Sequence, residues 1–246
     1  MERVALVTGA DTGIGWAVAR RLQRDGFAIA FHTRDDGPES RERLGELSGA
    51  GRAHWLVGDL RDAEVPARLV EEAVAELGRI DVLVNNAGVT STGPVLELTA
   101  DDFDEIFSTD VRGPFLLSVA AATWMREHGG GVIVNNTSVH EHRPRIGFAL
   151  YSSAKAALGM LTRQLALELA PDGIRVNAVA PGAIATARNK EADEVGDTVP
   201  LGRPGEPEEI AAVVSFLAGD ASSYMSGASV LVDGGFAQTS TARPAT

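Results

Sequence analysis

Three polar residues of this sequence have types and spacing that suit proton transfer. Tyr151 and Lys155 lie four residues apart at the start of a segment with helical spacing, so their side chains share one face of a helix. A free phenol has a pKa near 10, and an ammonium about 5 Å away favours the phenolate by roughly 3 kcal/mol. Ser138 lies thirteen residues before Tyr151 and can hold a carbonyl oxygen in place. Together they predict a site that moves a proton to or from such an oxygen.

A glycine-rich turn near the start of the chain suits the binding of a dinucleotide. Gly9, Gly13 and Gly15 stand between a short apolar run and a segment with helical spacing. Without Cβ atoms the backbone can turn sharply and approach a pyrophosphate, while N–H groups at the helix start point towards it. The spacing G-x-x-x-G-x-G differs from the commoner G-x-G-x-x-G, but its place between strand and helix supports the prediction. A hydride carrier beside a proton carrier predicts redox chemistry at a carbonyl or a secondary alcohol.

The residues after the second predicted strand bear on the choice of cofactor. In such folds an acidic residue at this point binds the free 2′-hydroxyl of NAD(H), whereas an arginine pairs with the 2′-phosphate of NADP(H). Thr33 stands where the acid would be, and Arg34 follows it directly. We therefore expect NADP(H) to be preferred over NAD(H). Asp35 and Asp36 oppose this expectation, because a carboxylate near the phosphate would repel it.

The elements that must position these residues alternate regularly along the chain. Helical spacing is seen through residues 18–22, 38–47, 63–77, 100–127, 150–170 and 208–218, and apolar strand-like runs cover 4–7, 27–31, 54–57, 80–84, 132–135, 175–179 and 229–232. Nearly unbroken apolar strands joined by helices predict parallel strands buried on both faces. We expect residues 1–246 to form a single-domain, Rossmann-type α/β fold, a doubly wound sheet of about seven parallel strands with helices on both faces.

Such sheets bind ligands beyond the carboxyl ends of their strands, which places the chemistry just after five strands, at Val7, Val57, Val84, Val134 and Val179. The segment 184–205 is long for a connection between a strand and a helix, and we interpret it as a substrate lid. Its alternative is a surface insertion without a role in binding. The small, polar segment 237–246 is expected to be a flexible tail.

Composition excludes several other kinds of protein. The 246 residues are 44% hydrophobic, contain no cysteine and carry a formal net charge of −12. The lack of cysteine excludes disulfides, thiolate metal sites and cysteine nucleophiles. The negative charge disfavours nucleic acid and anionic membranes as partners. The first apolar run is too short for a signal peptide or a spanning helix, so we expect a cytoplasmic protein that acts on a small molecule.

The motifs, taken in order, resemble the classical short-chain dehydrogenases/reductases along nearly the whole chain. The matching residues are Thr8-Gly9-x-x-x-Gly13-Ile14-Gly15, Asp59-Leu60, Asn85-Asn86-Ala87-Gly88, Ser138, Tyr151-x-x-x-Lys155, Pro181-Gly182-x-x-x-Thr186 and Asp233-Gly234-Gly235. The resemblance implies an NAD(P)(H)-dependent oxidoreductase whose chemistry is carried by Ser138, Tyr151 and Lys155. Within the family the chain looks like glucose 1-dehydrogenases and equally like 3-oxoacyl-carrier-protein reductases, so a sugar-type dehydrogenase and a ketoreductase both stay open.

The resemblance also implies which residues contact the cofactor and how the chain assembles. Cofactor contacts are implied for Gly9, Thr12, Gly13, Ile14, Gly15, Arg34, Asp59, Leu60, Asn86, Gly88, Tyr151, Lys155, Pro181, Gly182, Ile184 and Thr186. Asp59 and Leu60 would border the adenine, and Ile184 and Thr186 would meet the carboxamide. Family members commonly form tetramers in which the two long helices pack across a dimer interface, so a homotetramer or homodimer is expected.

Asp110 departs from the family pattern, which usually has asparagine at this position, where it helps to hold a water in a proton chain to the lysine. An ionised carboxylate accepts hydrogen bonds but cannot donate them. If it pairs with Lys155, it would partly cancel the effect of the ammonium on Tyr151, and we expect a shifted pH optimum with activity retained. The alternative is that Asp110 only contacts backbone inside a long helix.

Two residues between Ser138 and Tyr151, His140 and Glu141, are expected to line the substrate pocket. Adjacent loop residues lack the paired spacing of a zinc site, so no metal site is expected. Two further functions stay open: a non-redox step such as dehydration or cyclisation at the cofactor-bound site, and a non-catalytic nucleotide-sensing module. The intact set of serine, tyrosine and lysine argues against sensing, because sensing needs no proton donor.

Overall fold

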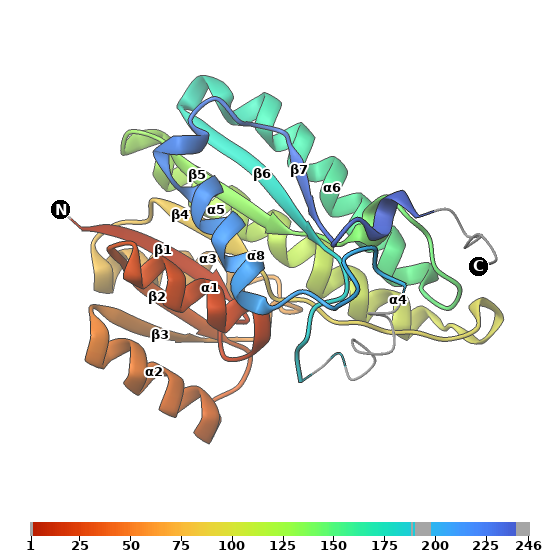
Figure 1. Ribbon diagram of the computed structural model, residues 1–246. Coiled ribbons are helices and arrows are strands. Elements are labelled where there is room, and N and C mark those ends of the chain that lie inside the picture. The colour runs from red at the N-terminus through yellow and green to blue at the C-terminus, as the bar shows by residue number, and fades with distance from the viewer. Residues whose placement is uncertain (1, 188, 190–197, 240–246) are drawn as a thin grey trace.

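The apolar runs of the sequence form the seven strands of one sheet in the computed structural model, which describes residues 2–187, 189 and 198–239 (Figure 1). The strands are β1 (Arg3–Thr8), β2 (Phe27–Thr33), β3 (Ala53–Val57), β4 (Val82–Asn85), β5 (Gly131–Asn136), β6 (Ile174–Pro181) and β7 (Ser229–Val232). Their order in the sheet is β3-β2-β1-β4-β5-β6-β7, and all neighbours are parallel. The predicted doubly wound, Rossmann-type sheet is confirmed.

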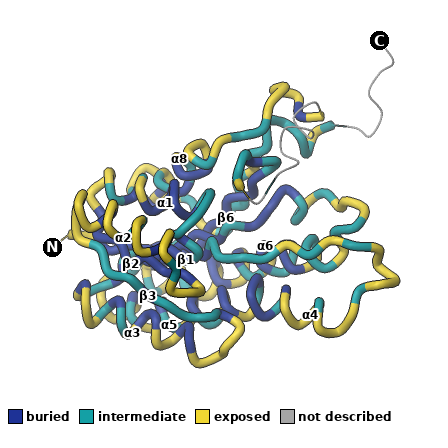
Figure 2. Tube along the Cα trace, turned by 90° about the horizontal axis from the view of Figure 1, so that it is seen from below, coloured by how far each residue is buried: buried dark blue, intermediate teal, exposed yellow. Residues whose placement is uncertain are grey.

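Helices cover both faces of this sheet. They are α1 (Gly13–Arg24), α2 (Pro38–Ala50), α3 (Val65–Leu77), α4 (Ala100–Phe107), α5 (Gly113–Glu127), α6 (Ala149–Leu169) and α8 (Pro207–Ala218). Helices α1 and α8 pack around Val7 on one face, and α3, α5 and α6 pack around Leu6 on the other. Successive strand residues point to opposite faces, so strands covered on both sides need apolar residues at nearly every position. Figure 2 shows β1 and β2 buried between layers whose outer sides are exposed.

The strand order changes direction between β1 and β4. From β1 the chain continues outwards through β2 and β3, and it then returns to place β4 on the other side of β1. The connections that leave the carboxyl ends of β1 and β4 therefore diverge and leave a crevice, which is where ligands bind in open α/β sheets. The glycine-rich turn follows β1, and Asn86 and Gly88 follow β4, so both groups meet at this crevice.

The long helix expected over 100–127 is present, but a π-helical turn interrupts its regular α-helical hydrogen bonding. Helix α4 ends at Phe107, a π-helical turn, η2, covers Ser108–Arg112, and α5 begins at Gly113. Proline at position 114 has no N–H, and its ring would clash with the carbonyl oxygen of Asp110 in a regular helix. The Gly113-Pro114 pair was the sequence signal for this π-helical turn. Turns of this kind occur often at functional sites, and this one carries Asp110.

The predicted lid and tail are only partly described. Ile184 forms a parallel bridge with Gly205, so the two ends of the lid segment are held together, whereas residues 188 and 190–197 lie outside the described residues. The predicted tail, 237–246, begins inside a short 3-10 turn, η6 (Phe236–Gln238), and residues 240–246 lie outside the described part. Among the described residues, no helix combines the length and the apolar character needed to cross a bilayer.

Candidate active site

Tyr151 and Lys155 lie on one face of α6, as their spacing predicts. The Lys155 ammonium lies 5.5 Å from the centre of the Tyr151 ring. It is buried, and it donates a hydrogen bond of 3.2 Å to the carbonyl oxygen of Asn136 at the end of β5. Only opposite charge or hydrogen bonds make a buried ammonium tolerable, so the surroundings of this lysine decide what it can do.

Asp110 supplies the opposite charge. Its carboxylate is fully buried, with Oδ2 2.9 Å from Lys155 Nζ and Oδ1 accepting the N–H of Val89 at 2.8 Å. Burial alone would lower the pKa of Lys155, but the attraction of Asp110, with a smaller contribution from Tyr151, outweighs it and the pKa is raised. Asp110 therefore makes both contacts that the sequence left open: an ion pair with Lys155 and a hydrogen bond to the backbone. Gly88 makes room for the pair, since a Cβ there would lie 2.9 Å from Oδ2.

Ser138 follows β5 and begins a short 3-10 turn, η3 (Val139–Glu141). Its hydroxyl oxygen accepts the N–H of His140 at 3.2 Å and so caps the turn. Because this bond uses a lone pair of the oxygen, the hydroxyl hydrogen is left for another acceptor. A serine held in this way can donate to a carbonyl oxygen placed in the crevice.

The glycine-rich turn has the shape that a dinucleotide phosphate requires. Gly9 and Gly13 have φ angles of +59° and +51°, and a Cβ at Gly15 would lie 2.0 Å from the carbonyl oxygen of Gly9. The first turn of α1 carries no acidic residue, and the side chain of Thr12 makes no capping hydrogen bond. Uncapped N–H groups at a helix start attract anions, so these residues fit the phosphates of the expected cofactor.

Asn86 braces this turn from the neighbouring strand end. Its amide nitrogen donates to the carbonyl oxygens of Thr8 at 2.9 Å and Gly9 at 3.0 Å, and its oxygen accepts from Asn136 Nδ2 at 2.9 Å. One side chain therefore ties together the ends of β1, β4 and β5. These bonds occupy the side chain, so Asn86 shapes the crevice through its neighbours.

His32 is a site residue that sequence reasoning missed. Its Nδ1 accepts the N–H of Gly9 at 3.4 Å, and its Nε2 lies 2.9 Å from the carbonyl oxygen of Gly58, an arrangement that requires the neutral ring. Burial lowers the pKa of His32 to about 4. The one available signal was a histidine inside an otherwise apolar strand, next to the position expected to meet the ribose.

The end of β2 and the loop after β3 carry the residues expected at the adenosine. Thr33 is buried, and its hydroxyl donates to the carbonyl oxygen of Asp35 while accepting from Trp55 Nε1 at 2.9 Å, so it is turned inwards. Arg34 is exposed and pairs with Asp35 at 2.7 Å, and this hydrogen bond raises the pKa of the guanidinium. Asp59 pairs with an arginine two residues later, at 2.6 Å, and Leu60 is buried beside it. Two arginines, each already paired with a carboxylate, therefore stand near this end of the crevice.

The residues expected at the nicotinamide follow β6. Pro181 ends the strand, and the Gly182 N–H donates to Val232 on β7 at 3.0 Å. Ile184 is buried, and the methyl group of Thr186 comes within 3.2 Å of where a Cβ at Gly13 would stand. The structure thus brings Thr186 against the glycine-rich turn, from which it is far in sequence.

Of the two residues expected to line the substrate pocket, only His140 lies beside the tyrosine. Its ring centre is 6.3 Å from that of Tyr151, and burial lowers its pKa. The carboxylate of Glu141 instead accepts from Ser229 Oγ at 3.0 Å, on β7, and is not part of the group around Tyr151. The described residues contain no group of three or more potential metal ligands.

Comparisons with known proteins agree with this geometry. A family model described as enoyl-(acyl carrier protein) reductase matches residues 9–237. The crystal structure of an acetoin dehydrogenase from Enterobacter cloacae is 43% identical, with a TM-score of 0.92, and the match covers 99% of both chains. The glucose 1-dehydrogenase of Gluconobacter oxydans is 39% identical over 94% of this chain and 90% of its own. A blue fluorescent protein from a metagenomic library, solved in complex with NADPH, is 39% identical, with a TM-score of 0.88, over 95% of this chain and 97% of its own.

Two of these relatives, the acetoin dehydrogenase and the glucose 1-dehydrogenase, are named for oxidoreduction and disfavour the two other functions that the sequence left open, a non-redox step and a sensing module. The similarity extends over nearly the whole chain and includes the sheet, the glycine-rich turn and the segment that carries the tyrosine and the lysine. The chain belongs to the short-chain dehydrogenase/reductase family and is an NAD(P)-dependent oxidoreductase that acts on a small molecule.

Proposed function

We propose that the chain transfers hydride between NADP(H) and a small carbonyl compound or secondary alcohol, with Ser138, Tyr151 and Lys155 as its catalytic residues. The observation that supports this most directly is the buried Lys155 ammonium, 5.5 Å from the centre of the Tyr151 ring. When bound, the nicotinamide supplies or accepts the hydride. The glycine-rich turn with Thr12 and Ile14 would hold the pyrophosphate, and Ile184 and Thr186 would border the nicotinamide.

The residues of the chain supply the proton and hold the oxygen. In reduction, the Tyr151 hydroxyl donates its proton to the carbonyl oxygen, and the Ser138 hydroxyl donates a hydrogen bond to the same oxygen. The positive charge of Lys155 stabilises the phenolate that results, and Asp110 limits this effect because it is paired with the same ammonium. In oxidation the proton moves in the opposite direction.

Relatives suggest which small molecules to test first. Similarity to an acetoin dehydrogenase and to a glucose 1-dehydrogenase supports a carbonyl or alcohol that carries a further hydroxyl group. We expect kcat/KM to be highest for small hydroxyketones, diols or sugars in a panel that also holds 3-oxoacyl thioesters and simple cyclic ketones. A clear preference for the thioesters would assign the chain to the ketoreductases of acyl chains.

Arg34 supports the preference for NADP(H). It stands exposed directly after β2, Thr33 occupies the position where an acid would bind the 2′-hydroxyl, and a relative was solved with NADPH. Its pairing with Asp35 opposes the preference, since the carboxylate must move aside for a phosphate. The ratio of kcat/KM with NADPH to that with NADH tests this, and a ratio below one would refute it.

Replacing Tyr151 by phenylalanine tests the chemistry. General acid catalysis contributes about 10²- to 10⁴-fold, and we expect kcat to fall by that factor in Tyr151→Phe while the Kd of NADPH stays within about twofold. Tyr224 is the other tyrosine of the sequence and is fully exposed, so Tyr224→Phe is the matched control. Turnover at a normal rate in Tyr151→Phe would mean that another group supplies the proton.

An apolar groove supports assembly of copies through the long helices. The groove, about 940 Å³, lies between α4, η2 and α5 on one side and α6 on the other, and its apolar lining includes Phe103, Phe107, Val111, Phe115, Met160 and Leu161. Phe103 and Met160 are 45% and 58% exposed, and burial against a second copy would remove this apolar surface from water. We expect light scattering to give the mass of a homodimer or a homotetramer. We propose the cytoplasm as the location of the protein.

A further inference from the structure

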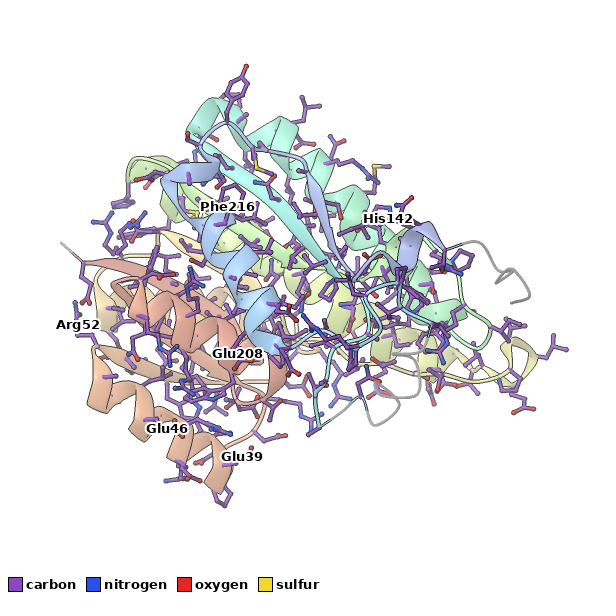
Figure 3. The ribbon with its side chains drawn as sticks, viewed as in Figure 1. Glu39, Glu46, Arg52, His142, Glu208 and Phe216 are labelled. Atoms are coloured by element: carbon purple, nitrogen blue, oxygen red, sulfur yellow. The ribbon has the colours of Figure 1, made fainter. Side chains whose placement is uncertain are left out.

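A carboxylate that the proposed chemistry does not use is buried against α6. The side chain of Glu141 is only 2% exposed. Its Oε2 accepts from Ser229 Oγ at 3.0 Å and lies 3.7 Å from Nε2 of His142, which Figure 3 labels, and its Oε1 lies 3.7 Å from Arg163 Nη1. A carboxylate is expensive to bury, so contacts from β7, from α6 and from the neighbouring His142 suggest a specific task.

The helix is shaped to receive this carboxylate. A Cβ at Gly159, in the middle of α6, would lie 2.1 Å from Glu141 Oε1 and 2.2 Å from its carboxyl carbon. Any other residue at position 159 would force the carboxylate out of its place. Glycine otherwise weakens the interior of a helix, so Glu141 and Gly159 form a matched pair.

Glu141 ends the turn that Ser138 begins. The Glu141 N–H donates to the carbonyl oxygen of Ser138 at 2.9 Å, and the Ser138 hydroxyl caps the same turn through His140. Turn η3 also packs against α6, the helix that carries Tyr151 and Lys155. The position of the serine relative to that helix therefore depends on how firmly the other end of η3 is held.

We propose that Glu141 is a positioning residue, whose buried carboxylate pins η3 to α6 and β7 and thereby fixes the position of the Ser138 hydroxyl relative to α6, the helix that carries Tyr151. The role of Ser138 in turnover rests on the proposed function, whereas the pinning itself does not. The pocket-lining role expected from the sequence is thereby replaced by one that acts through a neighbour.

Truncation of the side chain tests the proposal through turnover. A reacting group displaced by about 1 Å can cost about 10²-fold, so we expect Glu141→Ala to lower kcat about ten- to hundredfold with the Kd of NADPH within about twofold. Glu141→Gln keeps an oxygen for Ser229 and should lose less. Glu168→Ala is the matched control, because this glutamate is exposed on α6, the helix against which the Glu141 carboxylate is buried.

Combined variants separate positioning from general damage. Gly159→Ala should lower kcat by displacing the carboxylate, but it should add no loss to Glu141→Ala, where the new methyl group enters vacated space. Likewise Glu141→Ala should add no loss to Ser138→Ala. Losses that multiply in both pairs would overturn the proposal.

Hydrogen exchange gives a readout that needs no turnover. The N–H groups of Glu141, His142 and Arg143 are bonded within the turn, and we expect them to exchange at least about tenfold faster in Glu141→Ala than in the unchanged protein and in Glu168→Ala. If the unchanged protein reduces no carbonyl compound, the proposed function fails, but the exchange rates still test whether Glu141 holds the turn in place. Unchanged exchange rates in Glu141→Ala would overturn the proposed role of Glu141.

Discussion

The two sides of the crevice are built from different kinds of polar contact. On the cofactor side, the turn after β1 is held by uncharged groups: the hydroxyl of Thr8, the amide of Asn86 and the neutral ring of His32. On the proton-transfer side, buried contacts involve charge, with Lys155 on Asp110 and Glu141 near Arg163. The glycine-rich turn is shaped without charge, whereas the proton-transfer side buries the carboxylates of Asp110 and Glu141.

This difference follows from what each side has to do. A site for a phosphate needs free N–H groups and no buried carboxylate, because a negative charge there would repel the ligand. A site that moves a proton needs a strong local field, which a buried ammonium supplies. We therefore expect the cofactor side to respond mainly to changes of shape and the proton-transfer side mainly to changes of charge.

The largest effect is expected where shape is altered at the cofactor side. In Gly15→Ala the new Cβ would lie 2.0 Å from the carbonyl oxygen of Gly9 and 2.4 Å from Asn86 Nδ2, so the turn must shift. We expect stability to fall by about 3 kcal/mol and NADPH binding to be lost, as measured by chemical unfolding and by titration. Gly45→Ala is the control, since a Cβ there meets nothing within 4 Å in an exposed helix and should stabilise slightly. Normal NADPH affinity in Gly15→Ala would mean that the turn does not hold the phosphates.

Acid should destabilise the glycine-rich turn by protonating His32, a titratable residue whose ring accepts the Gly9 N–H. The pKa of His32 is about 4 in the folded chain, below the ordinary value of 6.5, so between these values the unfolded chain binds more protons. The stability that depends on the neutral ring is complete above pH 6.5 and falls as the pH is lowered, by about 3 kcal/mol at pH 4. Glutamine at position 32 keeps an acceptor and a donor but does not titrate. In His32→Gln, the part of the stability loss at low pH that comes from protonation of this ring should therefore vanish. Equal pH dependence of unfolding in both proteins would contradict this.

The features that could be predicted from the sequence are those that depend on the spacing of residues close together in the chain. The four-residue interval between Tyr151 and Lys155, the glycine-rich turn and the alternation of strands and helices each predict their structure from neighbours in the chain. The missing parts depend on contacts between distant strands. Thr33 is turned inwards because its hydroxyl accepts a hydrogen bond from Trp55 on the adjacent strand β3. In the sheet, Thr33 pairs with Val57, two residues after Trp55.

The same limit explains the charged side of the crevice. The number of residues between Asp110 and Lys155 does not predict the distance between their side chains, because Asp110 lies in a π-helical turn and Lys155 in a separate helix. Glu141 was expected in the pocket because it follows Ser138 closely, yet a short 3-10 turn carries its side chain to β7 and α6. Of these two features, only the π-helical turn left a signal in the sequence, the proline at position 114.

A smaller effect is expected where charge is removed from the proton-transfer side with its shape retained. The carboxylate of Asp110 accepts the Val89 N–H through Oδ1 and forms an ion pair with the Lys155 ammonium through Oδ2, whereas a neutral amide has one oxygen for both contacts. Asp110→Asn should therefore lower stability by about 1–3 kcal/mol. It should also leave the charge of Lys155 uncompensated, so that the ammonium stabilises the negative charge formed in proton transfer more strongly, and the acidic limb of the pH profile for alcohol oxidation should move to lower pH. Asp104→Asn removes an exposed charge from α4 and should leave the limb in place. An unchanged limb in Asp110→Asn would show that the pair is structural and does not tune the proton transfer.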